Sequence, residues 1–240
     1  MNPRVKPTVI TSGDKALGLG DAFMLAPALI ELSKKYNVRH IATNNSYNIL
    51  KYINNGKDRM ILNMDQQGHL YKNDHIKALD LVYWEVKNSL RSLGSHALNV
   101  VRDLAGLDPH VGELPEIPIP EKVENSVKDV YAEFKRPIVI VQPLMSYWNK
   151  MITREKQLSI VDAMVKKNYT VIQLTGPGLP QDMLHKEALD FVGKTSIEQS
   201  MAMIKHADLF VGCDSFGQHC ASFMKTPLTN ERLHTVMYVE

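Results

Sequence analysis

The chain has 240 residues, of which 44% are hydrophobic and 22% are charged, as is ordinary for a water-soluble globular protein. Its net charge is +2, from 28 basic and 26 acidic residues without a long basic run, so nucleic acid is neither required nor excluded as a partner. No apolar window approaches the roughly 20 residues of a membrane span and the first residues are not a signal peptide, so we expect a soluble, cytoplasmic protein.

Strands and helices alternate through the first half of the chain. Strands are predicted at 7–12, 38–43, 60–63 and 79–86, and helices at 21–36, 46–53 and 95–107. The loop 13–20 contains glycines that let the backbone approach a ligand closely, but they spell neither the dinucleotide fingerprint nor a P-loop. The alternation indicates a mostly parallel sheet with helices on both faces.

A proline-rich segment separates this half from the next. Residues 109–120, PHVGELPEIPIP, hold four prolines in twelve residues and can continue neither a helix nor a central strand. Such a stiff segment suits a hinge, so we predict two domains, 1–115 and 116–240.

The second half repeats the alternation. Helices are predicted at 121–134 and 154–167, strands at 138–142, 170–175 and 209–213, and a further short strand near Phe191 and Val192. A capping box at 195–198 opens a helix that runs to His206. The two cysteines, Cys213 and Cys220, have no metal-ligand spacing, and we expect both to be reduced core residues.

The last predicted strand leads directly into a helix that runs from Gly217 towards Met224. Asp214 and Ser215 lie at this junction and can cap the helix. The backbone N–H groups and the positive dipole end of a helix N-terminus attract anions, so this junction is a candidate anion site.

The stretch FVGCDSFGQHCASFMKTP resembles the nucleotide-sugar signature of glycosyltransferase family 9, the ADP-heptose lipopolysaccharide heptosyltransferases and their relatives. The resemblance rests on Asp214-Ser215, on His219 five positions after Asp214, on Ala221 and on Thr226-Pro227. Further matches occur in the family's order, at Gly20-Asp21 with Pro27-Ala28-Leu29, Gln142-Pro143, Lys150, Gly176-Pro177 and Gly193-Lys194-Thr195-Ser196.

The sequence departs from the family pattern at three points. Phe216 stands where the family usually has Gly, so the tight phosphate turn is expected one residue later, at Gly217. Ile152 replaces the usual Trp. The Gln142-Pro143 match is itself partial, because the family usually has His-Pro-Gly there. After Thr226-Pro227 only LTNERLHTVMYVE remains, where the family continues with a strand and a closing helix.

The resemblance implies an α/β fold of the GT-B type, with two Rossmann-like domains whose mostly parallel sheets face each other across a cleft. It assigns the acceptor to domain 1–115 and the nucleotide-sugar donor, with an ADP-sugar favoured, to domain 116–240. No Asp-x-Asp occurs in the sequence to hold a metal-bridged diphosphate, so we expect a metal-independent reaction, and attack opposite the leaving group predicts inversion at the anomeric carbon. No cofactor is needed because the nucleotide sugar is a substrate. The catalytic base is expected to be Asp21. Donor-binding residues are expected at Lys150, Thr175, Gly176, Asp214, Ser215, Phe216, Gly217, Gln218 and His219, and Gly18 and Gly20 are expected in the loop near the acceptor.

The sequence does not decide the identity of the acceptor. A saccharide acceptor is the family default, and peripheral membrane contact is compatible with it. A phage-type enzyme that glycosylates a modified DNA base is one alternative, although the sequence has no contiguous basic patch. A non-catalytic relative that binds a nucleotide sugar or a partner protein is another.

Overall fold

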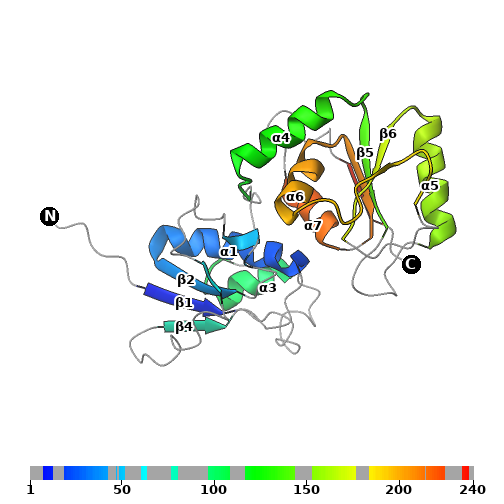
Figure 1. Cartoon of the computed structure of the whole chain (residues 1–240). Coiled ribbons are helices and arrows are strands. Elements are labelled where there is room, and N and C mark those ends of the chain that lie inside the picture. The colour runs from blue at the N-terminus through cyan, green and yellow to red at the C-terminus, as the bar shows by residue number, and fades with distance from the viewer. Residues whose placement is uncertain are drawn as a thin grey trace. The chain divides into compact units, whose positions relative to one another are not determined.

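The computed structural model of the protein divides into two units, Met1–Pro118 and Ile119–Glu240 (Figure 1). It describes residues 8–12, 19–42, 47, 49–51, 61–63, 77–80, 97–108, 117–143, 153–176, 184–213, 215–224 and 234–237. The division falls within the proline-rich segment, three residues after the predicted boundary between residues 115 and 116.

The first unit contains a parallel sheet of four strands. The strands are β1 (Thr8–Ser12), β2 (Asn37–Ala42), β3 (Ile61–Asn63) and β4 (Lys77–Asp80), in the order β3-β2-β1-β4. The predicted strand 79–86 is therefore placed too late, because β4 begins at Lys77 to pair with Val9 of β1. Residues 47, 49 and 50 are helical, as predicted for 46–53, residue 51 lies in a turn, and the rest of that segment lies outside the described residues.

Two helices of the first unit pack on each other. They are α1 (Leu19–Lys35) and α3 (Ala97–Leu104). Residues 22–29 of α1 are almost fully buried on every side of the helix. Glu31 of α1 accepts a 2.6 Å hydrogen bond from the guanidinium of Arg102 on α3. Because α1 begins at Leu19, Gly20 lies in its first turn and not in the preceding loop, where it was expected, and Asp21, predicted at the start of the helix, lies in the same turn.

In its described residues, the second unit contains four helices and a parallel sheet of five strands. The strands are β5 (Ile138–Gln142), β6 (Thr170–Gln173), β7 (Leu189–Asp190), β8 (Leu209–Gly212) and β9 (His234–Met237), in the order β7-β6-β5-β8-β9. The helices are α4 (Glu121–Ala132), α5 (Arg154–Lys166), α6 (Ile197–His206) and α7 (Phe216–Phe223). Every strand pair recorded in the two sheets is parallel, as the alternation predicted.

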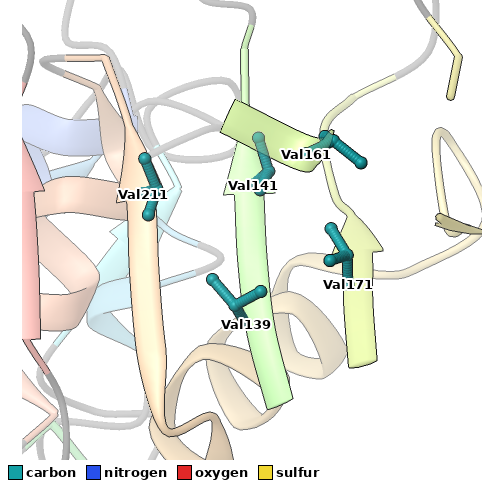
Figure 2. Close-up of a cluster of buried hydrophobic side chains, with 5 residues drawn as sticks. All are labelled: Val139, Val141, Val161, Val171 and Val211. Carbon is teal, nitrogen blue, oxygen red and sulfur yellow. The ribbon is translucent and has the colours of Figure 1, made fainter. Parts of the chain in front are cut away.

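Helices cover both faces of this second sheet. Figure 1 shows α5 on one face and α4, α6 and α7 on the other. The α5 face is filled by five valines, Val139, Val141, Val161, Val171 and Val211 (Figure 2). Each is at most 2% exposed, and such burial stabilises the fold by about 1.5 kcal/mol or more per side chain. Because strand side chains alternate, Ile138, Ile140 and Gln142 project towards α6 and α7 instead.

Three details of the second unit differ from the predictions. The short strand lies at Leu189–Asp190, where it pairs with β6, and not at Phe191 and Val192, which follow it. The capping box of α6 is formed by Ser196 and Gln199, one residue later than predicted, because Thr195 bonds Ser200 instead. Strand β9, which pairs in parallel with β8, was not predicted at all.

Among the described helices, none combines the length and the apolar character needed to cross a bilayer.

Candidate functional site

The strand order of the second unit marks one edge of its sheet as a place for a ligand. The chain runs outward from β5 through β6 to β7 and then crosses to β8 and β9 on the other side. The order therefore reverses between β5 and β8. Open α/β sheets bind ligands at such a reversal, outside the carboxyl ends of the strands. Gln142 ends β5 and Gly212 ends β8 at this point.

The helix that begins at this edge has an unusual N-terminus. Ser215 is the N-cap of α7 with extended backbone angles (φ −152°, ψ −176°), but its side chain makes no capping bond. Its Oγ is buried and has no hydrogen-bond partner among the described residues. A buried hydroxyl without a partner costs about 1–3 kcal/mol, which a bound ligand would offset.

Backbone groups add to this N-terminus. The first intrahelical bond of α7 runs from the His219 N–H to the Ser215 carbonyl, at 3.2 Å. The N–H groups before His219 thus have no acceptor within the helix, and the helix dipole makes this end positive. The first turn of α7 contains no acidic residue. The Ser215 hydroxyl and this terminus together make an anion-binding arrangement.

Gly217 lies deep beneath this arrangement. A Cβ at Gly217 would lie 1.8 Å from Oε1 of Gln142 and 2.7 Å from Cζ of Phe210. A Cβ at Gly212 would meet the same two residues, at 2.8 Å from Phe210 Cζ and 2.9 Å from the Gln142 carbonyl oxygen. Gly217 is the second residue of α7, not part of a turn, so the tight turn expected there is not found. The glycine is needed for close approach.

The residues of α7 divide into a buried face and a half-buried face. Gly217, Cys220 and Ala221 of α7 and Met224, the C-cap that follows it, are buried, at the spacing of one helix face. Phe216, Gln218 and His219, all predicted donor-binding residues, are half-buried on the other sides of the first turn. The first turn thus presents these three side chains outward and its glycine inward.

Two other predicted donor residues lie at the same edge of the sheet. Thr175 and Gly176 follow β6, and Thr175 is 9% exposed whereas Gly176 is exposed. The Thr175 carbonyl accepts a 2.9 Å bond from the Gly193 N–H, and Gly193 adopts a left-handed conformation with φ +64°. Lys194 then pairs with Asp190. In the described structure the Gly-Lys-Thr-Ser segment thus forms a turn and a helix cap.

Gly20 and Asp21 belong to the first unit. Its strand order also reverses, between β1 and β4, and α1 follows β1 there. Both residues are half-buried in the first turn of α1. Gly18, Lys150 and Asp214 lie outside the described residues.

Two residues at this edge were not predicted as site residues. Gln142 had been noted only as part of the Gln142-Pro143 match, and Phe210 only as part of a strand. Their proximity to Gly217 depends on strand order, which no local sequence pattern shows.

The cysteines and the potential metal ligands were also located. Cys213 and Cys220 are buried and unbridged, which confirms their prediction as reduced core residues, and burial raises the pKa of the Cys220 thiol. Within the described ranges, no three or more His, Cys, Asp or Glu side chains gather as a metal site would require.

A buried polar pair in the first unit was not anticipated either. His40 Nδ1 lies 2.8 Å from Thr11 Oγ1, and both residues are fully buried. His40 Nε2 has no hydrogen-bond partner among the described residues. Burial lowers the pKa of His40 from 6.5 to about 4. The ring is therefore neutral at physiological pH.

Known proteins resemble the chain in both sequence and fold. Lipopolysaccharide heptosyltransferase 3 of Escherichia coli K12 is 30% identical over an alignment of 111 positions, which covers 42% of this chain and 30% of that protein. The chain thus spans about a third of the length of this curated relative.

Solved structures match over much more of the chain. A family 9 glycosyltransferase from Veillonella parvula matches with a TM-score of 0.70 at 14% identity, over all of this chain and 89% of the other. The iron-containing heptosyltransferase TibC of enterotoxigenic Escherichia coli, solved with ADP-D-β-D-heptose, matches with a TM-score of 0.67 at 13% identity, over 99% and 59% of the two chains. The fold is therefore the α/β fold of the GT-B type.

A family model confirms the resemblance seen in the sequence. The model of glycosyltransferase family 9 (heptosyltransferase) matches residues 97–229, more than half of the chain. The match includes the α7 terminus and Lys150 but not Gly20 and Asp21. The chain belongs to glycosyltransferase family 9.

Proposed function

We propose that the protein is a glycosyltransferase that transfers a sugar, a heptose in the first instance, from an ADP-activated donor to a hydroxyl group of a saccharide acceptor. The observation that carries this proposal is the N-terminus of α7, with its buried, unpartnered Ser215 hydroxyl at the reversal of strand order. The donor class follows from the family and from the ADP-D-β-D-heptose bound to TibC.

The diphosphate of the donor would bind at this terminus. Its oxygens would accept hydrogen bonds from the Ser215 hydroxyl and from the N–H groups of the first turn. As the bond between the anomeric carbon and the diphosphate breaks, the electron pair leaves with ADP. The helix terminus and Lys150 would stabilise that developing negative charge.

The acceptor would be activated by Asp21. Its carboxylate would take the proton of the acceptor hydroxyl as the oxygen bonds to the anomeric carbon. Attack from the face opposite the departing ADP inverts the configuration at that carbon. No Asp-x-Asp occurs in the sequence to hold a metal-bridged diphosphate, so we propose that the transfer is metal-independent.

Binding of ADP tests the donor site directly. Ser215→Ala removes a hydrogen bond to a charged group, so the dissociation constant for ADP should rise by about tenfold or more in calorimetry. Ser222→Ala is the matched control, since Ser222 is exposed on the same helix and bonds only the Gln218 carbonyl within the described residues. Absence of ADP binding by the wild type, in a folded protein, would refute the donor site.

Turnover separates an enzyme from a binding protein. ADP-heptose should be consumed in the presence of a suitable saccharide, and nuclear magnetic resonance should show an inverted anomeric centre in the product. Asp21→Asn should bind ADP as the wild type does but lose turnover by at least about a hundredfold. A wild type that binds ADP without turnover on saccharides or on DNA would support the non-catalytic alternative. Undiminished turnover with EDTA would agree with metal independence.

A further inference from the structure

Gln142 occupies a position that no feature of the proposed chemistry explains. It ends β5 on the face that turns towards α7, and it is 9% exposed. Its side-chain oxygen fills the space into which a Cβ of Gly217 would project. A residue 75 positions earlier in the chain thus determines which residue the first turn of α7 can carry.

The same residue also fixes the start of the turn that leads into α7. The Gln142 carbonyl accepts a 3.4 Å bond from the Cys213 N–H, directly after β8. Gly212 lies against this carbonyl and against Phe210, the two residues that also border Gly217. Two glycines, one on each side of the junction that carries Ser215, therefore contact the same pair. Gln142 and Phe210 therefore limit where the segment between β8 and α7 can lie.

The chemistry of Gln142 also matters at this place. Its amide is polar but uncharged, and it lies beside the first turn of a helix that has no acidic residue there. A carboxylate of the same size would be attracted to the helix terminus itself and would repel a bound anion. A neutral group fills the space without competing for the terminus.

We propose that Gln142 is the positioning residue of the donor site. Its side chain, set into the space left by Gly217, holds the N-terminus of α7 and the Ser215 hydroxyl in place, and its neutrality leaves that terminus available to the donor diphosphate. This inference rests on the proposed function, because it assumes that the anion at α7 is the diphosphate.

A double-mutant cycle measures the steric contribution of Gln142, which is its contact with Gly217. ADP affinity is determined by calorimetry for the wild type, Gln142→Ala, Gly217→Ala and the double variant. Gly217→Ala alone should weaken ADP binding by about tenfold or more. The same change should cost clearly less in the Gln142→Ala background, where the closest contact, at 1.8 Å from Gln142 Oε1, is gone and only the contact with the Phe210 ring remains. Equal losses in both backgrounds would overturn the proposal, as would a Gly217→Ala variant that binds normally.

A charge substitution tests the same residue without touching the glycine. Gln142→Glu should weaken ADP binding by about tenfold or more while leaving the thermal midpoint of the unliganded protein unchanged or raised, because the helix dipole favours an acidic residue there. A purely structural role would lower the midpoint instead. Gln199→Glu is the matched control, since this first-turn residue of α6 forms a capping box that accepts either residue.

The outcomes distinguish the two proposals. If the wild type does not bind ADP, the proposed function fails, and the positioning role falls with it. If the wild type binds ADP and Gln142→Glu binds equally well, the proposed function stands and the positioning role fails. An equal loss in Gln199→Glu would show a general charge effect and would also refute the role of Gln142.

Discussion

Acidification should destabilise the first unit through one buried histidine. His40 has a pKa of about 4 in the folded protein, against 6.5 for an ordinary histidine, because burial disfavours its charged form. The unfolded chain therefore takes up a proton at a higher pH than the folded chain does. The contribution of His40 to stability is complete above pH 6.5 and is lost as the pH falls towards 4. The difference of about 2.5 between the two pKa values corresponds to about 3 kcal/mol in total.

Urea unfolding at two pH values measures this loss. Between pH 7.5 and 4.5 the wild type should lose about 2.5 kcal/mol more stability than His40→Asn, which keeps an amide near Thr11 but cannot ionise. Both proteins contain the same other titrating groups, so the difference between their pH slopes isolates His40. Hydrogen exchange of peptides from β1 and β2 would assign the loss to the first unit.

The reasoning would be refuted in either of two ways. The His40 ring could titrate near 6.5 in nuclear magnetic resonance of the folded protein, with the resonance identified by its absence in His40→Asn. Alternatively, the two proteins could show the same dependence of unfolding free energy on pH. Either result would mean that the ring is hydrated or that a partner stabilises its charge.

Three further predictions concern the stability of the second unit, measured by urea unfolding. Val141→Ala should cost about 2 kcal/mol, because it removes two methyl groups from the valine cluster under α5. Asp208→Ala should cost about 2 kcal/mol, since its carboxylate accepts bonds from Arg136 and from the Ile138 N–H, and Asp208→Asn, which keeps an acceptor, should cost less. Gly193→Ala should cost about 1 kcal/mol because of its left-handed φ of +64°, and a stability equal to wild type would contradict that conformation.

The sequence predicted best what depends on local pattern. Apolar runs such as 138–142 and 209–213 and the proline-rich segment between the units are visible over a few residues, and they gave the elements and the division of the chain. The exact ends of the helices and strands were predicted less accurately, with errors of one or two residues. At α6 the capping box was predicted at 195–198, but Ser196 and Gln199 form it one residue later, and Thr195 bonds Ser200 instead.

What the sequence could not predict depends on the order and register of the strands. Thr11 and His40 form a buried pair because β1 and β2 are neighbours in parallel register, and the spacing of 29 residues carries no such signal. Strand β9 was missed because its four residues gain their structure from pairing with β8. Ser215 is the N-cap of α7, a position that the sequence allowed, but its side chain makes no capping bond, and sequence alone does not distinguish the two cases.

The departure from the family signature at Phe216 has a physical explanation in α7. Consecutive helical residues point about 100° apart, so only one residue of the first turn faces β5 directly. In this chain that residue is Gly217, above Gln142, whereas Phe216 points to a half-buried side where a large ring is accommodated. Ser215 is extended and needs no glycine after it to make a left-handed turn. The requirement for a glycine is therefore set by the side chains of Gln142 and Phe210 that lie beneath the helix, so all three positions should be considered together when this site is engineered.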